Sequence, residues 1–293
     1  MIYDLFIGDE SFSSWSLRGW LMFEQFGLPV RVHLVGLYSG TLAEDLAPLA
    51  PARLVPVMCT PDGIVIGDTL AMAETLAERH PAADLWPADA AACGLARWIV
   101  AEMHSGFGAL RSACPMTLRN AWVGFEPSDA VRADVARIEE LWLLARARHG
   151  TEDSPWLFGR YCLADVFYAP VAARIAAYDL PVGPAARAYV DAHLSDPAFR
   201  RWRARGQARQ YDPLPYAMDL PKAPWPGPAP RQAHAVEAGP SENAACPYSG
   251  KPVTHFLGIE GRIFGFCNPV CRDKTVADPE VWPAFRDLLE RSC

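Results

Sequence analysis

The side chains with the clearest chemistry near the N-terminus are hydroxyls: Ser11, Ser13, Ser14 and Ser16 lie between an apolar run and the first helical pattern. A helix N-terminus offers free N–H donors and a partial positive charge, so it stabilises an anion or a thiolate placed there. The segment holds no Cys and cannot run dithiol–disulfide exchange with its own residues. A Ser hydroxyl can instead donate to the thiolate of a ligand and lower that thiol's pKa. The alternative is that these hydroxyls only cap the helix.

A second set of reactive residues crowds toward the C-terminus, where Cys246, Cys267, Cys271 and Cys293 lie close together in sequence. Four other Cys are scattered singly through the first 210 residues and are typical of reduced thiols in a cytosolic chain. The clustered set indicates a metal or redox site.

The elements that must position the Ser cluster follow a regular order. Apolar alternation, helical spacing and the Asp62-Gly63 turn predict strand, helix, strand, an optional helix, strand, hairpin strand and helix in succession. The corresponding stretches are 2–8, 16–26, 30–35, 51–59, 64–66 and a helix from residue 70. This order is the one a thioredoxin-like α/β domain requires.

The next part of the chain is helical by its periodicity. We expect helices at 92–112, 129–148, 165–178, 184–194 and 197–210. Residues 211–240 are rich in Pro, so we expect an extended linker that propagates neither helix nor sheet. The predicted domains are 1–80 (thioredoxin-like), 88–210 (all-helical), 211–243 (linker) and 244–293 (Cys-containing module).

The bulk properties restrict the partners. The formal charge is −7 and the pI about 5.5, with no convincing basic patch, so a nucleic-acid partner is not expected. The sequence shows neither a signal-peptide pattern nor an apolar stretch long enough for a membrane span. We therefore expect a cytoplasmic protein without a membrane partner.

Three short motifs together resemble the cytosolic glutathione transferases: residues 13–18 (Ser-Ser-Trp-Ser-Leu-Arg), 54–57 (Leu-Val-Pro-Val) and 67–71 (Gly-Asp-Thr-Leu-Ala). The first is most similar to the serine-type branch that includes the zeta class, whose motif reads Ser-Ser-Cys-Ser-x-Arg. Trp15 replaces the Cys of that motif, a departure that speaks against the zeta-type isomerase activity. The resemblance spans residues 1–210 and includes a buried helix start at 158–165, where Cys162 replaces the usual capping hydroxyl.

The resemblance implies a role for each matching residue. Ser13 would face the glutathione sulfur, with Ser14 as the second candidate. Val55 would pair its backbone with the cysteinyl part of glutathione, next to a cis Pro56, because an exposed backbone edge can pair with a peptide as an added strand. Asp68 and Thr69 would hold the γ-glutamyl end. The alternatives are an ordinary trans Pro56 and simple N-capping by Asp68 and Thr69.

In this family the second substrate lies between the two domains, against the first long helix of the second. Met103, His104, Phe107 and Arg111 fall in that stretch, with Met116 shortly after. Arg111 could attract an anionic group. The alternative is that the Met and Phe side chains belong to the core and that His104 is a satisfied helix residue.

The C-terminal residues resemble small treble-clef-like metal modules of the YHS/TRASH type, with Cys246, Cys267 and Cys271 as ligands. Ser249 stands where that pattern has a second Cys, so three thiolates remain for zinc, which prefers four ligands. His255, Asp273 and Cys293 are candidates for the fourth, and other thiophilic metals also suit three thiolates. The alternative is a metal-free module stabilised by Phe264, Phe266, Trp282 and Phe285.

The sequence therefore predicts a glutathione transferase fold and function: Ser13 stabilises the glutathione thiolate, which attacks a small electrophile in the interdomain cleft. The resemblance also implies a homodimer. The alternative function is a non-catalytic binding protein of the same fold with a metal- or redox-sensing C-terminal module. A glutaredoxin-like reductase is disfavoured, because Ser occupies the nucleophile position.

Overall fold

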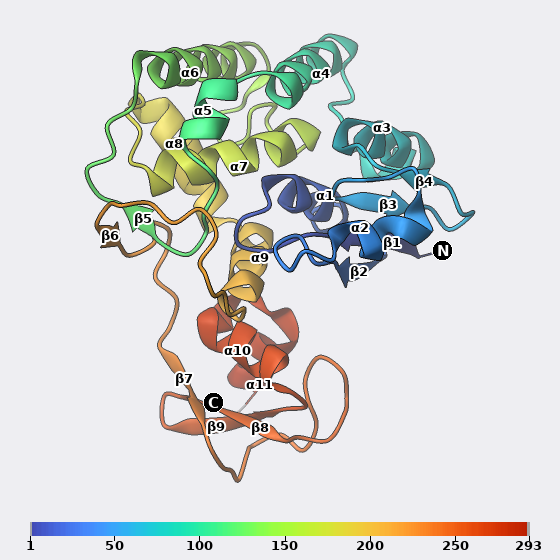
Figure 1. Ribbon diagram of the computed structural model, residues 1–293, viewed down its shortest axis with the longest axis vertical. Coiled ribbons are helices and arrows are strands. Elements are labelled where there is room, and N and C mark those ends of the chain that lie inside the picture. The colour runs from blue at the N-terminus through green and yellow to red at the C-terminus, as the bar shows by residue number, and fades with distance from the viewer. Residues whose placement is uncertain (1, 292–293) are drawn as a thin grey trace. The chain divides into compact units, whose positions relative to one another are not determined.

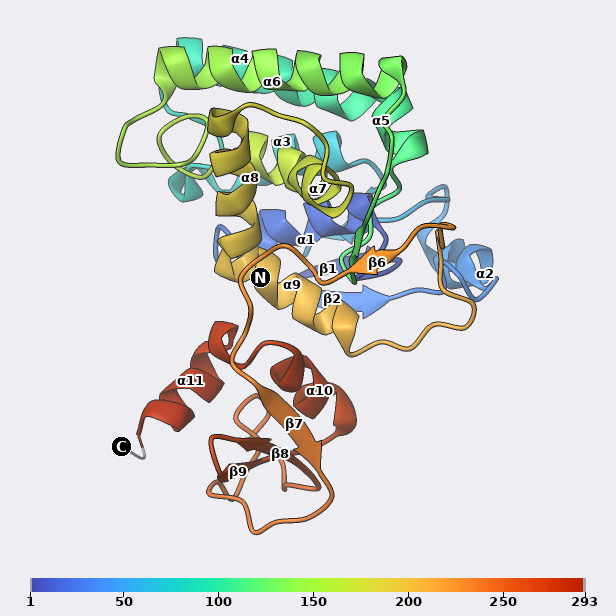
Figure 2. The same ribbon diagram turned by 90° about the vertical axis from the view of Figure 1, so that its left-hand side faces the viewer.

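The computed structural model describes residues 2–291. The chain forms two compact units (Figures 1 and 2). The first unit is the chain up to Leu194 together with Pro215–Pro226, and the second is Ser195–Leu214 together with the chain from Gly227. The finer division into four domains stays a prediction. Within residues 2–291, no helix combines the length and the apolar character that crossing a bilayer requires.

The N-terminal part of the first unit is a four-stranded sheet in the order β2-β1-β3-β4. Strands β1 and β2 pair in parallel, and β3 and β4 continue the sheet in antiparallel register. The strands are β1 (Tyr3–Ile7), β2 (Val30–Leu34), β3 (Val57–Cys59) and β4 (Val65–Ile66). The helices are α1 (Ser14–Glu24), α2 (Leu42–Leu46), η1 (Ala47–Leu49), α3 (Thr69–Arg79) and η2 (Pro81–Ala83). The predicted thioredoxin-like order of elements is confirmed.

Helices α1 and α3 lie side by side against the sheet (Figure 1). Gly19 of α1 allows this helix to approach the turn before β3, because a Cβ at this position would lie 2.9 Å from Cγ of Pro56. A smaller apolar cluster joins Leu46 and Leu49 to Val57 of the sheet. This cluster packs α2 and η1 against the sheet next to the turn before β3.

The helical part of the first unit follows. Its helices are α4 (Ala90–Ser105), α5 (Gly108–Ala113), α6 (Asp129–His149), α7 (Leu163–Ala177) and α8 (Pro184–Ser195). Every residue of α7 is buried, as expected for its apolar sequence. The prediction of one helix over 92–112 is wrong: the chain breaks at Gly106, and Phe107 adopts a left-handed conformation with φ of 56°.

The start of α7 contains a buried, fully partnered carboxylate. Asp165 accepts hydrogen bonds from the N–H of Cys162 (2.9 Å), the N–H of Leu157 (3.2 Å) and the hydroxyl of Tyr189 (2.8 Å). Burial raises the pKa of Asp165 to about 6, and these hydrogen bonds act in the opposite direction. Asp165 thus caps α7 and ties the turn before this helix to α8.

The second unit combines α9 (Pro197–Gln207) with a three-stranded antiparallel sheet and two further helices. The sheet has the order β7-β8-β9, from Ala233–Val236, His255–Ile259 and Arg262–Phe266. The remaining elements are α10 (Pro269–Ala277), η3 (Pro279–Val281) and α11 (Pro283–Glu290). Arg200 of α9 donates two hydrogen bonds of 2.9 Å to the buried carboxylate of Asp278.

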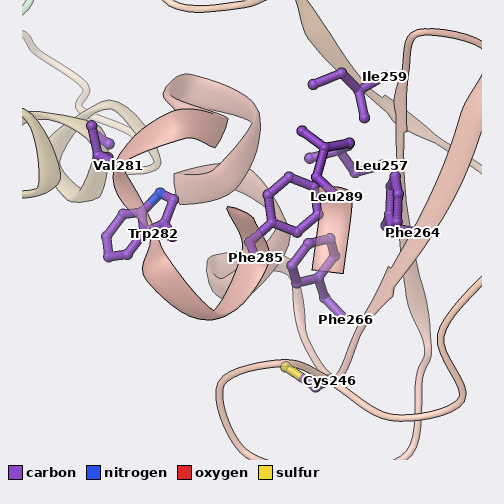
Figure 3. Close-up of a cluster of buried hydrophobic side chains, with 10 residues drawn as sticks. Cys246, Leu257, Ile259, Phe264, Phe266, Val281, Trp282, Phe285 and Leu289 are labelled. Atoms are coloured by element: carbon purple, nitrogen blue, oxygen red, sulfur yellow. The ribbon is translucent and has the colours of Figure 1, made fainter. Parts of the chain in front are cut away.

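Aromatic side chains fill the core of the second unit. Phe264 and Phe266 of β9 pack against Phe285 of α11 at ring distances of 5.2 and 5.7 Å, and all three are fully buried. Figure 3 shows these rings pointing toward one another, with Cys246 at the edge of the cluster. All four residues named in the metal-free alternative thus belong to one apolar core, so this unit has packing of its own beside any metal.

The Pro-rich segment departs from its prediction, because two of its stretches form strands. Strand β7 follows the last Pro of the dense run, Pro230, and pairs with β8 along its full length. Further upstream, β6 (Lys222–Ala223) pairs with β5 (Ala121–Trp122) of the first unit. The prolines interrupt sheet formation, and two of the Pro-free stretches between them pair.

Candidate functional site

The first unit contains a cavity of about 800 Å³, within the range of ligand-binding pockets. Its lining comes from the β1–α1 loop and the start of α1, the turn before β3, the start of α3, and helices α5 and α7. Tyr38 and Tyr216 complete the wall. The cavity brings together the three motifs on which the predicted glutathione site rests.

Ser13 and Ser14 both line this cavity at the start of α1. Ser13 is the N-cap: its Oγ accepts from the N–H of Ser16 (3.3 Å) and donates to Oγ of Ser16 (2.8 Å). Oγ of Ser16 also accepts from the N–H of Gly8 (3.0 Å). Oγ of Ser14 accepts from Nη2 of Arg174 at 3.4 Å. The capping alternative for Ser13 is therefore present in the geometry, and capping does not remove its oxygen from the cavity wall.

The turn before β3 presents a backbone edge. The Val55–Pro56 peptide bond is cis, as the resemblance implies, and both residues line the cavity. Within residues 2–291, the backbone N–H and C=O of Val55 have no hydrogen-bond partner in the protein. This unpaired edge is of the kind that binds an extended peptide.

The start of α3 supplies a carboxylate and a hydroxyl. Oδ1 of Asp68 accepts from the N–H groups of Leu70 (2.8 Å) and Ala71 (3.0 Å). Oδ2 of Asp68 lies 3.2 Å from Nε2 of His104. Thr69 is 1 % exposed, and its Oγ1 has no partner among the described residues. Asp68 is thus the helix cap, and Thr69 offers a free hydroxyl at the cavity wall.

Only some of the residues predicted to contact the second substrate line the cavity. Arg111 lines the cavity, as does Met116. Met103 and Phe107 do not line it; they are buried, since Met103 lies on the inward face of α4 and Phe107 at the break before α5. These two side chains therefore have the core surroundings that the alternative predicted.

His104 lies behind the cavity wall. Its ring meets the Trp15 ring edge-on at 5.1 Å, and Trp15 does line the cavity. Burial lowers the pKa of His104; the charges of Arg18 and Arg111 act in the same direction, and Asp68 opposes them. His104 therefore supports Trp15 and Asp68 without reaching the cavity itself.

Sequence reasoning missed several lining residues, above all Arg174, Tyr38 and Tyr216. Arg174 had a signal: it is the only charged residue between Asp165 and Asp179, in a helix otherwise suited to the core. Tyr216 had none, because it follows α9 in a segment predicted to be a linker. Phe12, Tyr38 and Tyr216 meet at ring distances of 6.1 to 6.3 Å and form an aromatic rim.

A separate cluster lies in the second unit. The Sγ atoms of Cys246, Cys267 and Cys271 all lie within 4.8 Å of one another. Oγ of Ser249 donates to Sγ of Cys267 at 3.2 Å, and Nδ2 of Asn268 donates to the same sulfur at 3.2 Å. Burial alone raises the pKa of Cys246, but backbone hydrogen bonds from Cys267 and Tyr248 outweigh it and bring the value to about 7.

The donor set of this cluster fits one thiophilic ion held by three sulfur atoms. Ser249 is close to the cluster and already bonded to it. His255 and Asp273, two predicted fourth ligands, are not members of the group found among residues 2–291. The third, Cys293, lies outside the described residues.

The N-terminal part of the first unit is similar to a known protein family. Residues 12–79 match the family model "Glutathione S-transferase, N-terminal domain". This stretch begins at the Ser cluster and ends with α3, so it contains all three motifs of the predicted glutathione site. A comparison with curated protein sequences found no significant match.

Solved structures extend the likeness into the helical part. A glutathione transferase homolog from Burkholderia gl BGR1 with bound glutathione matches with a TM-score of 0.53 at 22% identity, over 72% of this chain and 100% of that one. A glutathione S-transferase from Rhodospirillum rubrum F11 gives 0.54 at 20%, over 72% and 94%. A homolog from Lodderomyces elongisporus with two glutathione molecules per subunit gives 0.53 at 19%, over 69% and 98%.

These likenesses establish a glutathione transferase fold: a thioredoxin-like N-terminal domain followed by a helical part. The matched structures are covered almost completely, whereas more than a quarter of this chain has no counterpart in them. At 19–22% identity these likenesses show the fold alone.

Proposed function

We propose that this protein is a glutathione transferase that activates the glutathione thiol at the start of α1 for attack on a small electrophile. The observation that carries the proposal is the convergence, in one cavity, of the Ser13–Ser14 helix start, the cis Val55–Pro56 edge and the start of α3. In the reaction the thiol proton leaves to solvent, and the thiolate forms a carbon–sulfur bond while a leaving group departs with its electron pair.

Each part of the cavity has a role in this proposal. Val55 pairs its free N–H and C=O with the cysteinyl part of glutathione, as an added strand. Thr69 donates its free hydroxyl, together with the N-terminus of α3, to the γ-glutamyl carboxylate. Asp68 accepts from the γ-glutamyl ammonium group, in place of part of its contact with His104.

Ser13 is the proposed thiolate partner. Its hydroxyl donates to Oγ of Ser16 at 2.8 Å, so it must rotate this proton toward the sulfur while its oxygen keeps accepting from the N–H of Ser16. Ser14 is the second candidate: it accepts from Arg174, which leaves its own hydroxyl proton available. Either hydroxyl lowers the pKa of the bound thiol by bonding to its charged form.

The proposal is tested by calorimetric titration of glutathione into the full chain, followed by thiolate absorbance of the complexes. We expect binding with a thiolate signal in the wild type and binding without that signal in Ser13→Ala. Ser105→Ala, an exposed position of α4, is the matched control and keeps both. Loss of the signal in Ser14→Ala alone would move the role to Ser14. Absence of wild-type binding at millimolar glutathione would overturn the transferase proposal.

A second candidate function is favoured by the Cys cluster of the second unit. Three sulfur atoms within 4.8 Å suit zinc or another thiophilic ion, and such a site would make this unit a metal- or redox-sensing module beside a fold that only binds glutathione. Metal analysis of the full chain tests this. We expect about one bound ion per chain in the wild type and in Cys93→Ser, and none in Cys271→Ser. A wild-type chain without metal after reconstitution with zinc or Cu(I) would contradict it.

We also infer that the chain forms a homodimer in the cytoplasm, as implied by the resemblance to its family. Light scattering behind size exclusion measures the molar mass of the particle directly. A mass of twice the 32.2 kDa chain supports the dimer, and a mass of one chain at micromolar concentration contradicts it.

A further inference from the structure

Three arginines gather behind and along one wall of the cavity: Arg18 of α1, Arg111 of α5 and Arg174 of α7. Arg18 is 1 % exposed and Arg174 is 5 % exposed, which is rare for a charged side chain. Among residues 2–291 none of the three forms an ion pair with a carboxylate. Nε and Nη1 of Arg18 have no hydrogen-bond partner at all in that part of the chain.

All three guanidinium groups lie at or next to the cavity: two of them line it, and the third contacts the lining residue Trp15. Arg111 and Arg174 line the cavity. The Arg18 guanidinium carbon lies 4.5 Å from the centre of the Trp15 ring, and that of Arg111 lies 5.1 Å from it. Trp15, itself a lining residue, therefore contacts two cations.

The surroundings leave this positive charge uncompensated. Burial, followed by the charges of Arg174 and Arg111, lowers the pKa of Arg18 to about 9, and burial with Arg111 lowers that of Arg174 to about 10. Both groups still carry their charge at neutral pH. The charge of Asp68 raises the pKa of Arg18, but this carboxylate already binds the N-terminus of α3 and His104.

The protein bonds of Arg174 show which part of it is free for a ligand. Its Nε donates to the carbonyl of Cys114 (2.8 Å) and its Nη1 to the carbonyl of Pro170 (3.2 Å). Its Nη2 has only the long contact of 3.4 Å with Oγ of Ser14. The free edge of this guanidinium group therefore lies at the cavity wall beside the start of α1.

We propose that the electrophilic substrate of this enzyme carries a carboxylate, which binds Arg111 and Arg174 on the helical wall of the cavity. Arg binds a carboxylate by charge-assisted hydrogen bonds, and an anion here supplies the compensation that the protein lacks. The inference rests on the proposed function and adds the class of substrate. With the probe 4-chloro-3-nitrobenzoate, the glutathione sulfur bonds to the ring carbon, the carbon–chlorine bond breaks, and chloride leaves with its electron pair.

The test compares this acid with 4-chloro-3-nitrobenzamide, a neutral molecule with the same leaving group. The quantity measured is the ratio of kcat/KM for the acid to kcat/KM for the amide, with glutathione in excess. We expect the wild type to prefer the acid, and Arg111→Gln to lower the ratio about 10- to 100-fold, the effect of one charge-assisted hydrogen bond. Arg132→Gln, an exposed position of α6, is the matched control and keeps the wild-type ratio.

Two further measurements separate the possible failures. Arg174→Met, with its fold checked by circular dichroism, should lower the same ratio. Equal ratios in the wild type and Arg111→Gln overturn the inference while the transferase proposal stands. A loss of glutathione affinity in Arg111→Gln equal to the loss in the ratio also overturns it, because the arginine would then serve a carboxylate of glutathione. If the chain turns over neither probe, titration with 3-nitrobenzoate decides: weaker binding by Arg111→Gln supports the anion site, and equal or absent binding refutes it.

Discussion

Asp165 and Arg18 are both buried charged side chains of the first unit, and they differ in what surrounds them. Asp165 receives three hydrogen bonds from the turn before α7 and from Tyr189. Arg18 has two guanidinium nitrogens without a partner among residues 2–291 and shares its neighbourhood with two more arginines. The chain completes the first environment by itself, whereas the second becomes complete only when an anion binds.

The largest expected effect concerns Asp165, whose hydrogen-bond donors all come from the chain itself. Asp165→Ala leaves the N–H groups of Leu157 and Cys162 and the Tyr189 hydroxyl buried without an acceptor. We expect a loss of about 3–5 kcal/mol in the free energy of unfolding, measured with urea. Asp191→Ala, an exposed position of α8, should change it by less than about 0.5 kcal/mol. A loss below about 1 kcal/mol for Asp165→Ala would show that this network is not structural.

The next largest effect concerns metal removal from the second unit. Its three clustered thiols are comparable to Arg18, because a bound ion would complete their surroundings as an anion would complete those of Arg18. If the cluster holds an ion present at about 1,000 times its dissociation constant, that ion stabilises the chain by about 4 kcal/mol. We expect a chelator to shift the urea midpoint of the wild type and of Cys93→Ser downward, and to leave Cys271→Ser unchanged. An identical midpoint for the wild type with and without chelator contradicts a structural metal.

The pH dependence of the free energy of unfolding gives a further test close to Asp165. The ring of His193 lies 4.6 Å from the ring of Tyr189, which donates a hydrogen bond to Asp165. Burial lowers the pKa of His193 to about 3, so the folded chain holds it neutral while the unfolded chain protonates it below about 6.5. The unfolded state then binds more protons, and stability present above pH 6.5 is lost as the pH falls toward 3.

This loss amounts to about 2 kcal/mol between pH 6.5 and pH 5. The raised pKa of Asp165 acts in the opposite direction between about pH 4 and 6, so the variant must be compared with the wild type at each pH. We expect His193→Gln to lose about 2 kcal/mol less than the wild type over this interval, by urea unfolding. His149→Gln, at a half-buried position of α6, should follow the wild type. Parallel curves for His193→Gln and the wild type would contradict the assignment.

The smallest expected effect concerns Arg18, two of whose guanidinium nitrogens lack hydrogen-bond partners within residues 2–291. Arg18→Met removes a buried charge without a carboxylate partner and keeps the apolar volume, so we expect the free energy of unfolding to rise by about 1 kcal/mol. Arg200→Met is the contrasting variant, because it leaves the buried Asp278 unpaired and should cost about 3 kcal/mol. A large loss for Arg18→Met would mean that this arginine is structural after all.

The parts predicted from sequence are those fixed by local patterns. The thioredoxin-like order followed from period and turn chemistry, and the cis Val55–Pro56 bond was implied by the resemblance to the glutathione transferases. The split between α4 and α5 was missed because a left-handed Phe107 is a rare choice of backbone conformation that side-chain periodicity does not encode.

The parts missed in the cavity depend on contacts between distant stretches. Arg174 stands in an apolar helix, and only the fold shows that its free edge faces Ser14, 160 residues away in sequence. Tyr216 reaches the rim because β6 pairs with β5, a pairing of two-residue strands that no periodicity can signal.

That pairing has a consequence for the order in which the protein matures. The first unit is assembled from two separate stretches, and Pro215–Pro226 leaves the ribosome only after α9 has been synthesised. A chain that ends before residue 215 lacks Tyr216, so its cavity has no aromatic wall on that side. The aromatic rim of the cavity is thus complete only after α9 has been synthesised.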